Sequence, residues 1–203
     1  MNISTPLSNE TIAKLQLGDI VYITGKLFTA RDRIHKYLAE GNAPPVDLQG
    51  QVIYHAGPIA VRKNGKWEFW AFGPTTSVRQ EPYTPYLIEK LGVKVIIGKG
   101  GMGKEVQEAC RKHKAVYLHT IGGGGVILAN CVKKVSKVYL QEFGMPEAMW
   151  EVEVEGFPAI CTIDSRGQSL HTEIHDQSIQ KLEKTNGKHQ KKLQHPKHSQ
   201  VNK

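Results

Sequence analysis

The sequence has few cysteines, and none of them forms a CxxC pair. Cys110, Cys131 and Cys161 are the three in 203 residues, and their odd number and wide spacing argue against a disulfide framework. Three thiolates can hold an iron–sulfur cluster. Free cysteine is more often a small buried hydrophobe, and we expect Cys110 and Cys131 in helices and Cys161 in a strand.

Long apolar runs are also missing. No stretch of 18 apolar residues occurs, so the sequence predicts no transmembrane helix. Residues 1–19 have no basic segment followed by an apolar one, which is the pattern of a secretory signal. We therefore expect a cytoplasmic protein.

Positive charge is abundant, but it is concentrated near the C-terminus. The net charge is +8, and residues 177–203 contain seven lysines and one glutamate, hence six of those charges. This segment has no aromatic residue to stack on a nucleic-acid base, which disfavours an RNA-binding tail. We predict one domain over residues 1–176 and a basic polar tail over 177–203 that is partly disordered.

The order of expected elements indicates an α/β fold with a mixed sheet covered by helices, because apolar strands alternate with helices. Asn64–Gly65 is a strong hairpin turn signal, and Thr29 is a candidate helix cap. The expected strands are residues 19–24, 51–55, 59–63, 66–72, 93–97, 115–120, 137–140 and 157–163. The expected helices are residues 8–16, 29–40, one that starts near Pro85, 104–113, 126–135 and 173–185.

A glycine loop over residues 98–103 lies between a predicted strand and a predicted helix. It fits GxGxxG, but the next strand ends in His119 and Thr120 without the acid that holds a ribose. It nearly fits a P-loop, but Glu105 stands where a Ser or Thr would bind magnesium. Both nucleotide sites are therefore disfavoured. We expect the loop and Lys99 to bind another anion, a phosphate or a carboxylate, at the helix N-terminus.

Two further segments carry cations at junctions between elements, where α/β folds build sites. Arg31 and His35 are four residues apart at the start of a predicted helix, and Arg79 follows the hydroxyl run that begins at Thr75. A solvated Arg31 paired with Asp32, and His35 as a packed histidine, are the structural alternatives. With Lys99, the cations suit a small dianion.

Several motifs resemble one enzyme family when they are taken in order. These are GDIVYITG, TARDRIH, HAGPIAVRKNGKWE, GPTTSVR, GVKVIIGKGGMGKE and GMPEAMW. Together they are similar to the β subunit of L-tartrate dehydratase and of two-subunit class I fumarate hydratase, over roughly residues 18–170. The same region is the C-terminal domain of single-chain class I fumarases.

The resemblance implies a swivelling β/β/α domain and an assembly of two α and two β chains. It implies that the α subunit carries a [4Fe–4S] cluster and that this chain binds none by itself. By motif position, Arg31, Thr75, Arg79 and Lys99 would bind a small dicarboxylate substrate. Thr75 and His35 would be catalytic, as candidates for proton transfer. Gln80 departs from the family, which often has Met there.

The expected activity is hydro-lyase activity, with fumarate hydration to malate preferred and tartrate dehydration to oxaloacetate as the alternative. The motifs do not separate these two substrates. A non-catalytic anion-binding module and a nucleotide-binding protein remain as other classes. Activity with an α subunit would exclude the first, and absence of nucleotide binding would exclude the second.

Overall fold

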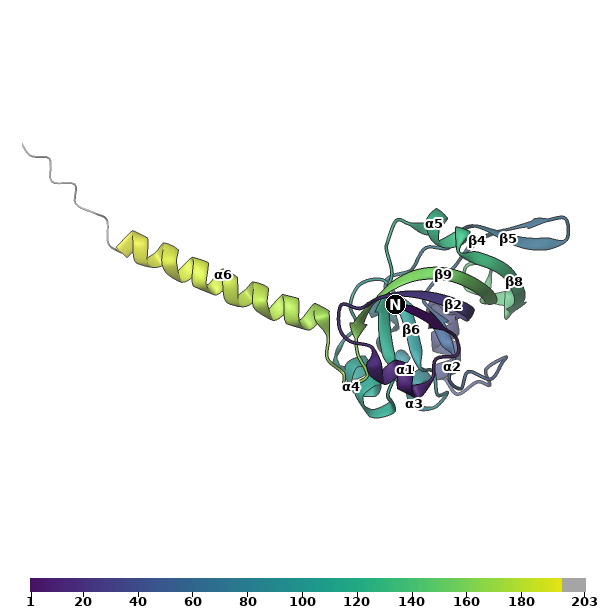
Figure 1. The fold of residues 1–203 in the computed structure, drawn as a ribbon, viewed down its shortest axis with the longest axis horizontal. Helices are drawn as coiled ribbons and strands as arrows, with labels where there is room; N and C mark the ends of the chain where they lie inside the picture. Colours follow the sequence, from purple (N-terminus) through teal and green to yellow (C-terminus); the bar gives the residue numbers. More distant parts are fainter. Residues whose placement is uncertain (195–203) are drawn as a thin grey trace, which may run out of the picture. The chain divides into compact units, whose positions relative to one another are not determined.

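The structure is a computed structural model that describes the backbone of residues 1–194 and the side-chain surroundings of residues 1–185. Residues 1–169 form one compact unit, and a second begins at Leu170. The strands are β1 Asn2–Ser4, β2 Ile20–Thr29, β3 Val52–Tyr54, β4 Ile59–Lys63, β5 Lys66–Ala71, β6 Val95–Gly98, β7 Val116–His119, β8 Val132–Tyr139 and β9 Met149–Ile163 (Figure 1). The helices are α1 Asn9–Lys14, α2 Asp32–Ala39, α3 Thr84–Glu89, α4 Lys104–His113, α5 Gly125–Asn130 and α6 Leu170–Gln194, with short 3-10 turns η1 Ser77–Gln80 and η2 Gln141–Phe143.

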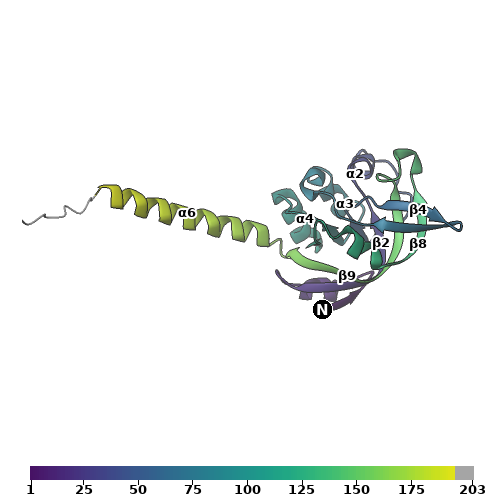
Figure 2. The same ribbon diagram turned by 90° about the horizontal axis from the view of Figure 1, so that it is seen from above.

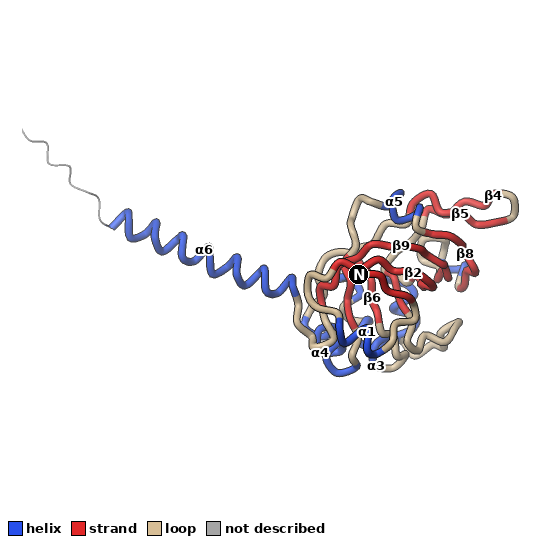
Figure 3. The backbone as a smooth tube through the Cα atoms, viewed as in Figure 1, coloured by secondary structure: helices blue, strands red, loops and turns tan. Residues whose placement is uncertain are grey.

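The main sheet is mixed and closes on itself. Its order is β1-β2-β3-β6-β7-β9-β8, and β9 also pairs with β2. Strands β1, β2, β3, β6 and β7 pair in parallel, whereas β9 runs antiparallel to β2, β7 and β8. The strands are drawn in red in Figure 3. Because β9 pairs with both β2 and β7, the strands β2, β3, β6, β7 and β9 form a ring. The predicted α/β class with a mixed sheet is confirmed.

The central strands are buried on both faces, so their side chains alternate between two cores. Val52 and Tyr54 of β3 belong to the core enclosed by β2, β9 and the hairpin, whereas Ile53 faces the other core. The same alternation separates Ile97 from Ile96 in β6. A continuous apolar run in sequence is thus the expected pattern for a strand that is covered on both sides.

Helices α2, α3 and α4 lie together on one side of the sheet (Figure 2). Their apolar faces form the second core with Ile53 and Ile96. The helical members of this core are Ile34, Leu38, Leu87, Ile88, Val106, Ala109 and Cys110. The segment that carries Arg31 is therefore fixed against the sheet through α2.

The hairpin β4–β5 has the turn that the sequence predicts. Asn64 and Gly65 have φ values of 51° and 77°, which are the left-handed conformations of a two-residue hairpin turn. Trp67 and Phe69 of β5 pack edge-on against Trp150, with ring centroids 5.3 and 5.2 Å apart. This packing fixes the end of β5, from which the Thr75 loop departs.

The predicted strand end at Gly25 and helix start at Thr29 are wrong. Strand β2 continues through Gly25 to Thr29, with a bulge at Gly25, where a Cβ would lie 2.4 Å from Oγ1 of Thr5. The Thr29 hydroxyl donates to the Ala148 carbonyl and accepts the Trp150 N–H. Helix α2 begins at Asp32 instead, because the Thr29 side chain is engaged by β9.

Two later boundaries also differ from the prediction. The expected helix over residues 126–135 ends at Asn130, and β8 begins at Val132. Strand β8 carries Lys133, Lys134 and Lys137, and such charges suit an edge strand that faces solvent. The same lysines break the alternation of apolar and polar residues, so the sequence pattern predicts a helix instead. The last strand starts at Met149, well before residue 157. Charged residues alternate with buried valines from residue 151 to 155, which is the pattern of a strand with one face in the core. Cys131 ends α5 as its C-cap rather than lying within a helix.

The second unit contains helix α6, which includes the helix predicted over residues 173–185. The described side chains from Thr172 to Thr185 are exposed. The predicted division at residue 176 and the tail over 177–203 stay predictions, and residues 195–203 lie outside the described part of the chain. Within the described residues, no helix is long and apolar enough to cross a membrane.

We predict that ending the chain at residue 185 leaves the thermal unfolding midpoint of residues 1–169 unchanged within about 2 °C. The physical reason is that residues 1–169 have their own two cores. The measurement is calorimetry of the full and shortened chains. Leu38→Ala is the positive control, because a buried Leu→Ala change costs about 2–5 kcal/mol and should lower the midpoint visibly. A drop of more than about 5 °C on truncation would contradict the prediction.

Candidate functional site

The site is built where β3 and β6 end beside each other. These strands are parallel neighbours, so their carboxyl ends meet at one edge of the sheet, where α/β folds place ligands. The loop after β5 crosses this edge and is fixed to it by two isolated bridges, Ala56 with Pro74 and Thr76 with Lys99. The loop therefore carries Thr75 and Arg79 to the segment that carries Lys99.

Thr75 and Arg79 are in direct contact. Nη2 of Arg79 donates to Oγ1 of Thr75 at 2.6 Å and to Oδ2 of Asp32 at 3.1 Å. The other oxygen of Asp32 accepts Nε2–H of Gln80 at 2.9 Å. The arginine fork is thus oriented by a carboxylate that is itself bound by a buried amide, and the arginine side chain remains 49% exposed.

Arg31 lies at the N-cap of α2, next to Asp32 in the chain. Its Nε is 3.1 Å from Oε1 of Glu147, but the N–H direction leaves it without a hydrogen-bond acceptor. Glu147 also accepts the backbone N–H of Arg33 at 3.1 Å and so caps the helix that Thr29 was expected to cap. A Cβ at Gly57 would lie 2.8 Å from Cδ of Arg31, so the glycine leaves room for the arginine.

His35 is fully buried and has only its backbone neighbour as a polar partner. Its Nδ1 lies 3.0 Å from the Arg31 carbonyl oxygen, which can only accept, so Nδ1 carries the proton. Burial lowers the pKa of His35 to about 4, with smaller opposing effects of the Arg31 carbonyl and Asp32. His35 is thus a neutral imidazole, and among the described atoms its Nε2 has no hydrogen-bond partner.

His55 packs edge-on against His35, with ring centroids 4.8 Å apart. It follows β3 directly, is fully buried, and its carbonyl accepts the Thr75 N–H at 2.7 Å. Burial, and then the neighbouring His35, hold the pKa of His55 well below its usual value. The sequence-predicted His35 is therefore connected to the Thr75 loop through a histidine that sequence reasoning missed.

Ser77 joins this loop to Lys99. Its Oγ accepts the Lys99 N–H at 3.0 Å and lies 2.9 Å from Nδ1 of His55, and its own N–H donates to the Lys99 carbonyl at 3.0 Å. A Cβ at Gly98 would lie 1.9 Å from the same Oγ, so only glycine fits there. The first glycine of the loop therefore serves this contact.

Lys99 is the most available of the three cations. Its stem crosses Gly122, where a Cβ would lie 2.8 Å from the lysine Cδ. Within the part of the chain that the structure describes, it has no ion-pair partner, unlike Arg31 and Arg79. The ammonium is free to meet an anion.

A carboxylate already lies at the N-terminus of α4, where an anion was expected. The carboxylate of Glu81 already accepts the N–H groups of Gly103 at 2.6 Å and Val106 at 3.1 Å. A side-chain carboxylate at this position satisfies the helix N-terminus and repels a second anion. Glu81 therefore disfavours a second anion at the helix end and leaves Lys99 as the better candidate to bind one.

Sequence reasoning missed the residues that connect the predicted ones. His55, Ser77 and Glu147 all contact a segment far from them in sequence. Asp32 was expected to pair with Arg31 but lies against Arg79, and Arg31 lies against Glu147 instead. Gln80 was noted only as a departure from the family. One signal was available: a histidine directly after a buried strand, at the edge where ligands bind.

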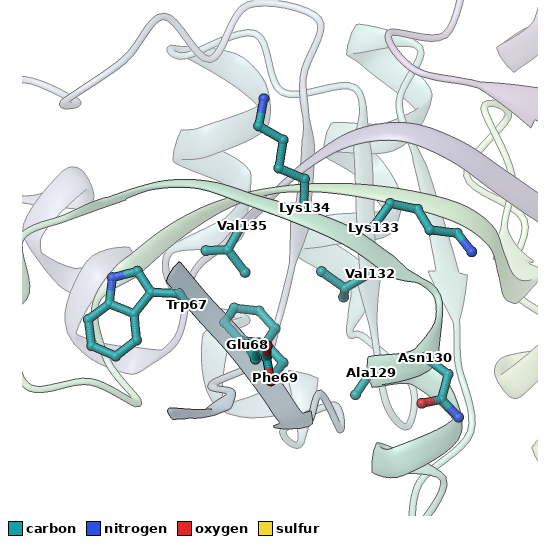
Figure 4. A pocket seen from close by; sticks show the side chains of 9 residues that line it. All are labelled: Trp67, Glu68, Phe69, Ala129, Asn130, Val132, Lys133, Lys134 and Val135. Atoms are coloured by element: carbon teal, nitrogen blue, oxygen red, sulfur yellow. The ribbon is translucent and has the colours of Figure 1, made fainter. Parts of the chain in front are cut away.

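A cavity of about 330 Å³ lies elsewhere, between β5, α5 and β8 (Figure 4). Its walls include Trp67, Phe69, Ala129, Asn130, Val132 and Lys133. None of the predicted site residues lines it. The site described above is therefore defined by its polar contacts and not by this cavity.

The cysteines of this chain do not fit cluster ligation. Cys110 and Cys161 are fully buried, and burial raises the pKa of both thiols, that of Cys161 to about 12. Burial also raises the pKa of Cys131. Iron is bound by thiolates, which these environments disfavour. Among the described residues, no group of three or more His, Cys, Asp or Glu is placed to hold a metal ion.

Comparison with known proteins gives consistent matches. A family model described as Fumarase C-terminus matches residues 1–174. A putative fumarate hydratase class I of Geobacillus stearothermophilus is 47% identical over 183 residues, which are 90% of this chain and 35% of that protein. The L(+)-tartrate dehydratase subunit beta of Escherichia coli K12 is 44% identical over 84% of this chain and 86% of its own length. The chain thus spans about a third of the Geobacillus relative and most of the Escherichia coli subunit.

The buried state of His35 predicts a loss of stability in acid. As the pH falls below 6.5, the unfolded chain binds a proton at this histidine, whereas the folded chain does not until about pH 4. The free energy of unfolding should therefore be highest above pH 6.5. It should fall between pH 6.5 and pH 4, by up to about 3 kcal/mol from this residue. Urea unfolding at a series of pH values measures the slope.

His35→Gln should reduce the dependence of the free energy of unfolding on pH. The dependence that remains should come in part from His55, whose pKa is also lowered by burial. His175→Gln is the matched control, because His175 is exposed on α6, and it should keep the wild-type slope. An unchanged slope in His35→Gln would show that this histidine does not titrate as the burial requires.

Proposed function

The chain belongs to the Fumarase C-terminus family, and from this membership we propose that it is the β subunit of a two-subunit iron–sulfur hydro-lyase. The proposed reaction is the reversible hydration of fumarate to malate. The observation that carries the proposal is the contact of Arg79 with the Thr75 hydroxyl at 2.6 Å, beside Lys99 and Arg31. This arrangement combines cationic groups for carboxylates with a hydroxyl for proton transfer.

A second candidate substrate has its own support. The chain matches most of the length of a protein named L(+)-tartrate dehydratase subunit beta. Dehydration of tartrate to oxaloacetate also removes water from a hydroxy dicarboxylate, so the same clamps and proton transfer serve it. Substrate comparison on one enzyme preparation decides between the two.

In the proposed mechanism, the cations bind the substrate carboxylates. Arg79 offers a planar fork that can bind a carboxylate with two parallel hydrogen bonds. Lys99 supplies an ammonium that pairs with no carboxylate among residues 1–185. Arg31 lies next to Asp32 at the start of α2 and completes the set of cations. The pair of Arg79 with Asp32 is about half exposed, so substrate can replace the aspartate at small cost.

Thr75 is the group proposed to move the proton at the carbon next to a carboxylate. In the hydration direction the Thr75 hydroxyl would donate its proton to that carbon, and the Arg79 N–H stabilises the negative charge left on the Thr75 oxygen. In the dehydration direction the same alkoxide would take the proton back. His35 is the other candidate, but its ring is fully buried and bound to the Arg31 carbonyl. Thr75 is half-buried and lies beside the cations, which favours it over His35.

The [4Fe–4S] cluster belongs to the partner in this proposal, because the thiols of this chain do not fit it. When bound, such a cluster supplies a Lewis acid for the hydroxyl group that leaves or arrives. The cluster-bearing α subunit, in an assembly of two α and two β chains, would complete the site. This chain contributes binding, orientation and proton transfer.

Co-expression with a cluster-bearing α subunit tests the proposal. We expect the pure chain alone to be inactive and the complex to interconvert fumarate and malate, or to dehydrate tartrate, under anaerobic conditions. Absorbance of fumarate in the ultraviolet follows the first reaction. A folded complex with intact cluster and no hydro-lyase activity on either substrate would reject the function.

Arg79→Lys and Thr75→Val separate binding from proton transfer in that complex. Lysine lacks the planar fork, so Arg79→Lys should weaken transition-state binding by about 2–4 kcal/mol, roughly 30- to 1000-fold in kcat/KM. Valine keeps the shape of Thr75 but has no hydroxyl, so kcat should fall by about 10²–10⁴ while KM changes little.

Steady-state kinetics must be paired with thermal unfolding and cluster content for these variants. Thr76→Val is the matched control for Thr75→Val, because Thr76 is the exposed neighbour in the same loop. Unchanged turnover in Thr75→Val or Arg79→Lys would remove that residue from the site. Loss of stability with normal turnover per folded complex would show that the residue only supports the loop.

A further inference from the structure

The contact of His55 with Ser77 joins the two segments that carry the proposed catalytic groups. Both side chains are fully buried, and Nδ1 of the histidine lies 2.9 Å from the serine Oγ. Ser77 lies two residues after Thr75 and two before Arg79 in the same loop. Its Oγ also accepts the Lys99 N–H at 3.0 Å. One hydroxyl thus connects the hydroxyl-bearing loop with the lysine segment.

The backbone of His55 reinforces the same junction. Its N–H donates to the Ile97 carbonyl of β6 at 2.8 Å, and its carbonyl accepts the Thr75 N–H at 2.7 Å. The end of β3, the end of β6 and the Thr75 loop therefore meet at this single residue. A shift of the imidazole would move Thr75 and Lys99 relative to each other.

The chemistry of the pair requires a hydrogen bond and not only a ring of the right size. The Ser77 hydroxyl has one proton, and it already accepts from Lys99, so it can donate to a neutral Nδ1 or accept from it. Burial and the nearby His35 keep the histidine neutral. Replacing Ser77 by alanine takes this partner from both the Lys99 N–H and the buried Nδ1 of His55. Removing the imidazole takes the His55 contact from the Ser77 Oγ, which still accepts the Lys99 N–H. Either change loosens the junction of the two segments.

We propose that His55 and Ser77 are positioning residues that fix the Thr75 hydroxyl relative to the Lys99 ammonium, an inference that rests on the proposed function. Neither needs to touch the substrate. A displacement of about 1 Å between reacting groups can lower a rate by about 100-fold, so the pair acts on turnover more than on binding.

Two amide replacements of His55 test this in the enzyme complex. Asparagine places its amide near the position of Nδ1 and can still bond Ser77, whereas glutamine places its amide near Nε2 and cannot. We expect His55→Gln and Ser77→Ala to lower kcat by about 10- to 100-fold with KM changed by less than about threefold. His55→Asn should keep kcat within about fivefold of wild type.

The controls are Ser136→Ala and His175→Asn, which change exposed residues and should keep wild-type kinetics. Three results would overturn the inference. The first is a kcat of His55→Asn no higher than that of His55→Gln, and the second is a normal kcat per folded complex in both variants, as expected if the pair only fills space. The third is an increase in KM with unchanged kcat.

Amide hydrogen exchange on the full chain gives a readout without activity. In Ser77→Ala, the Lys99 amide loses its acceptor and should exchange at least about tenfold faster, while the Val116 amide in the sheet should not change. Unchanged exchange at Lys99 would contradict the positioning of that segment. An inactive wild-type complex together with this exchange pattern would reject the hydro-lyase function. The contact of Ser77 with the Lys99 segment would still be supported.

Discussion

The pairing of strand β9 with both β2 and β7 is the constraint on which the rest of the structure depends. It closes the sheet around one core and fixes the order in which β3 and β6 stand beside each other. Because those two strands are parallel, their carboxyl ends deliver His55 and Lys99 to the same edge. The same strand also engages Thr29 through the Trp150 N–H, and this contact sets where α2 can begin. Long-range strand pairing therefore places the segments of the site side by side, in addition to the contacts among the site residues themselves.

The sequence predicted correctly those parts of the fold that depend on the conformational preferences of neighbouring residues. The turn at Asn64–Gly65 requires left-handed backbone, which few residues adopt, and the apolar strand over residues 93–97 stands between two turn signals. The failures have a different cause. Thr29 has the chemistry of a helix cap, but Ala148 and Trp150 compete for its hydroxyl from 119 and 121 residues away. No window of sequence contains that competition.

The site shows the same division. The cations Arg31, Arg79 and Lys99 are visible as residue types at element junctions, and the resemblance to a family assigned them a common ligand. The groups that orient them were not visible, because Asp32 meets Arg79 from 47 residues away and Ser77 meets His55 from 22. Glu81 is the clearest case. Its carboxylate accepts two N–H groups at the N-terminus of α4, where the glycine loop alone predicts an external anion.

The charge balance of the site supports a shared catalytic centre. Arg31, Arg79 and Lys99 bring three positive charges, and two of them already face the carboxylates of Glu147 and Asp32. A dicarboxylate that bound only to Lys99 would leave one of its charges without a partner. Binding of a dianion therefore requires Asp32 or Glu147 to give up its arginine, or a positive group from outside this chain. The pair of Arg79 with Asp32 is half exposed and weakly held, and the aspartate keeps its bond to Gln80 when the arginine turns away. Arg79 can thus change partners without leaving a bare carboxylate behind, which is the property that a substrate clamp at the surface of one subunit needs.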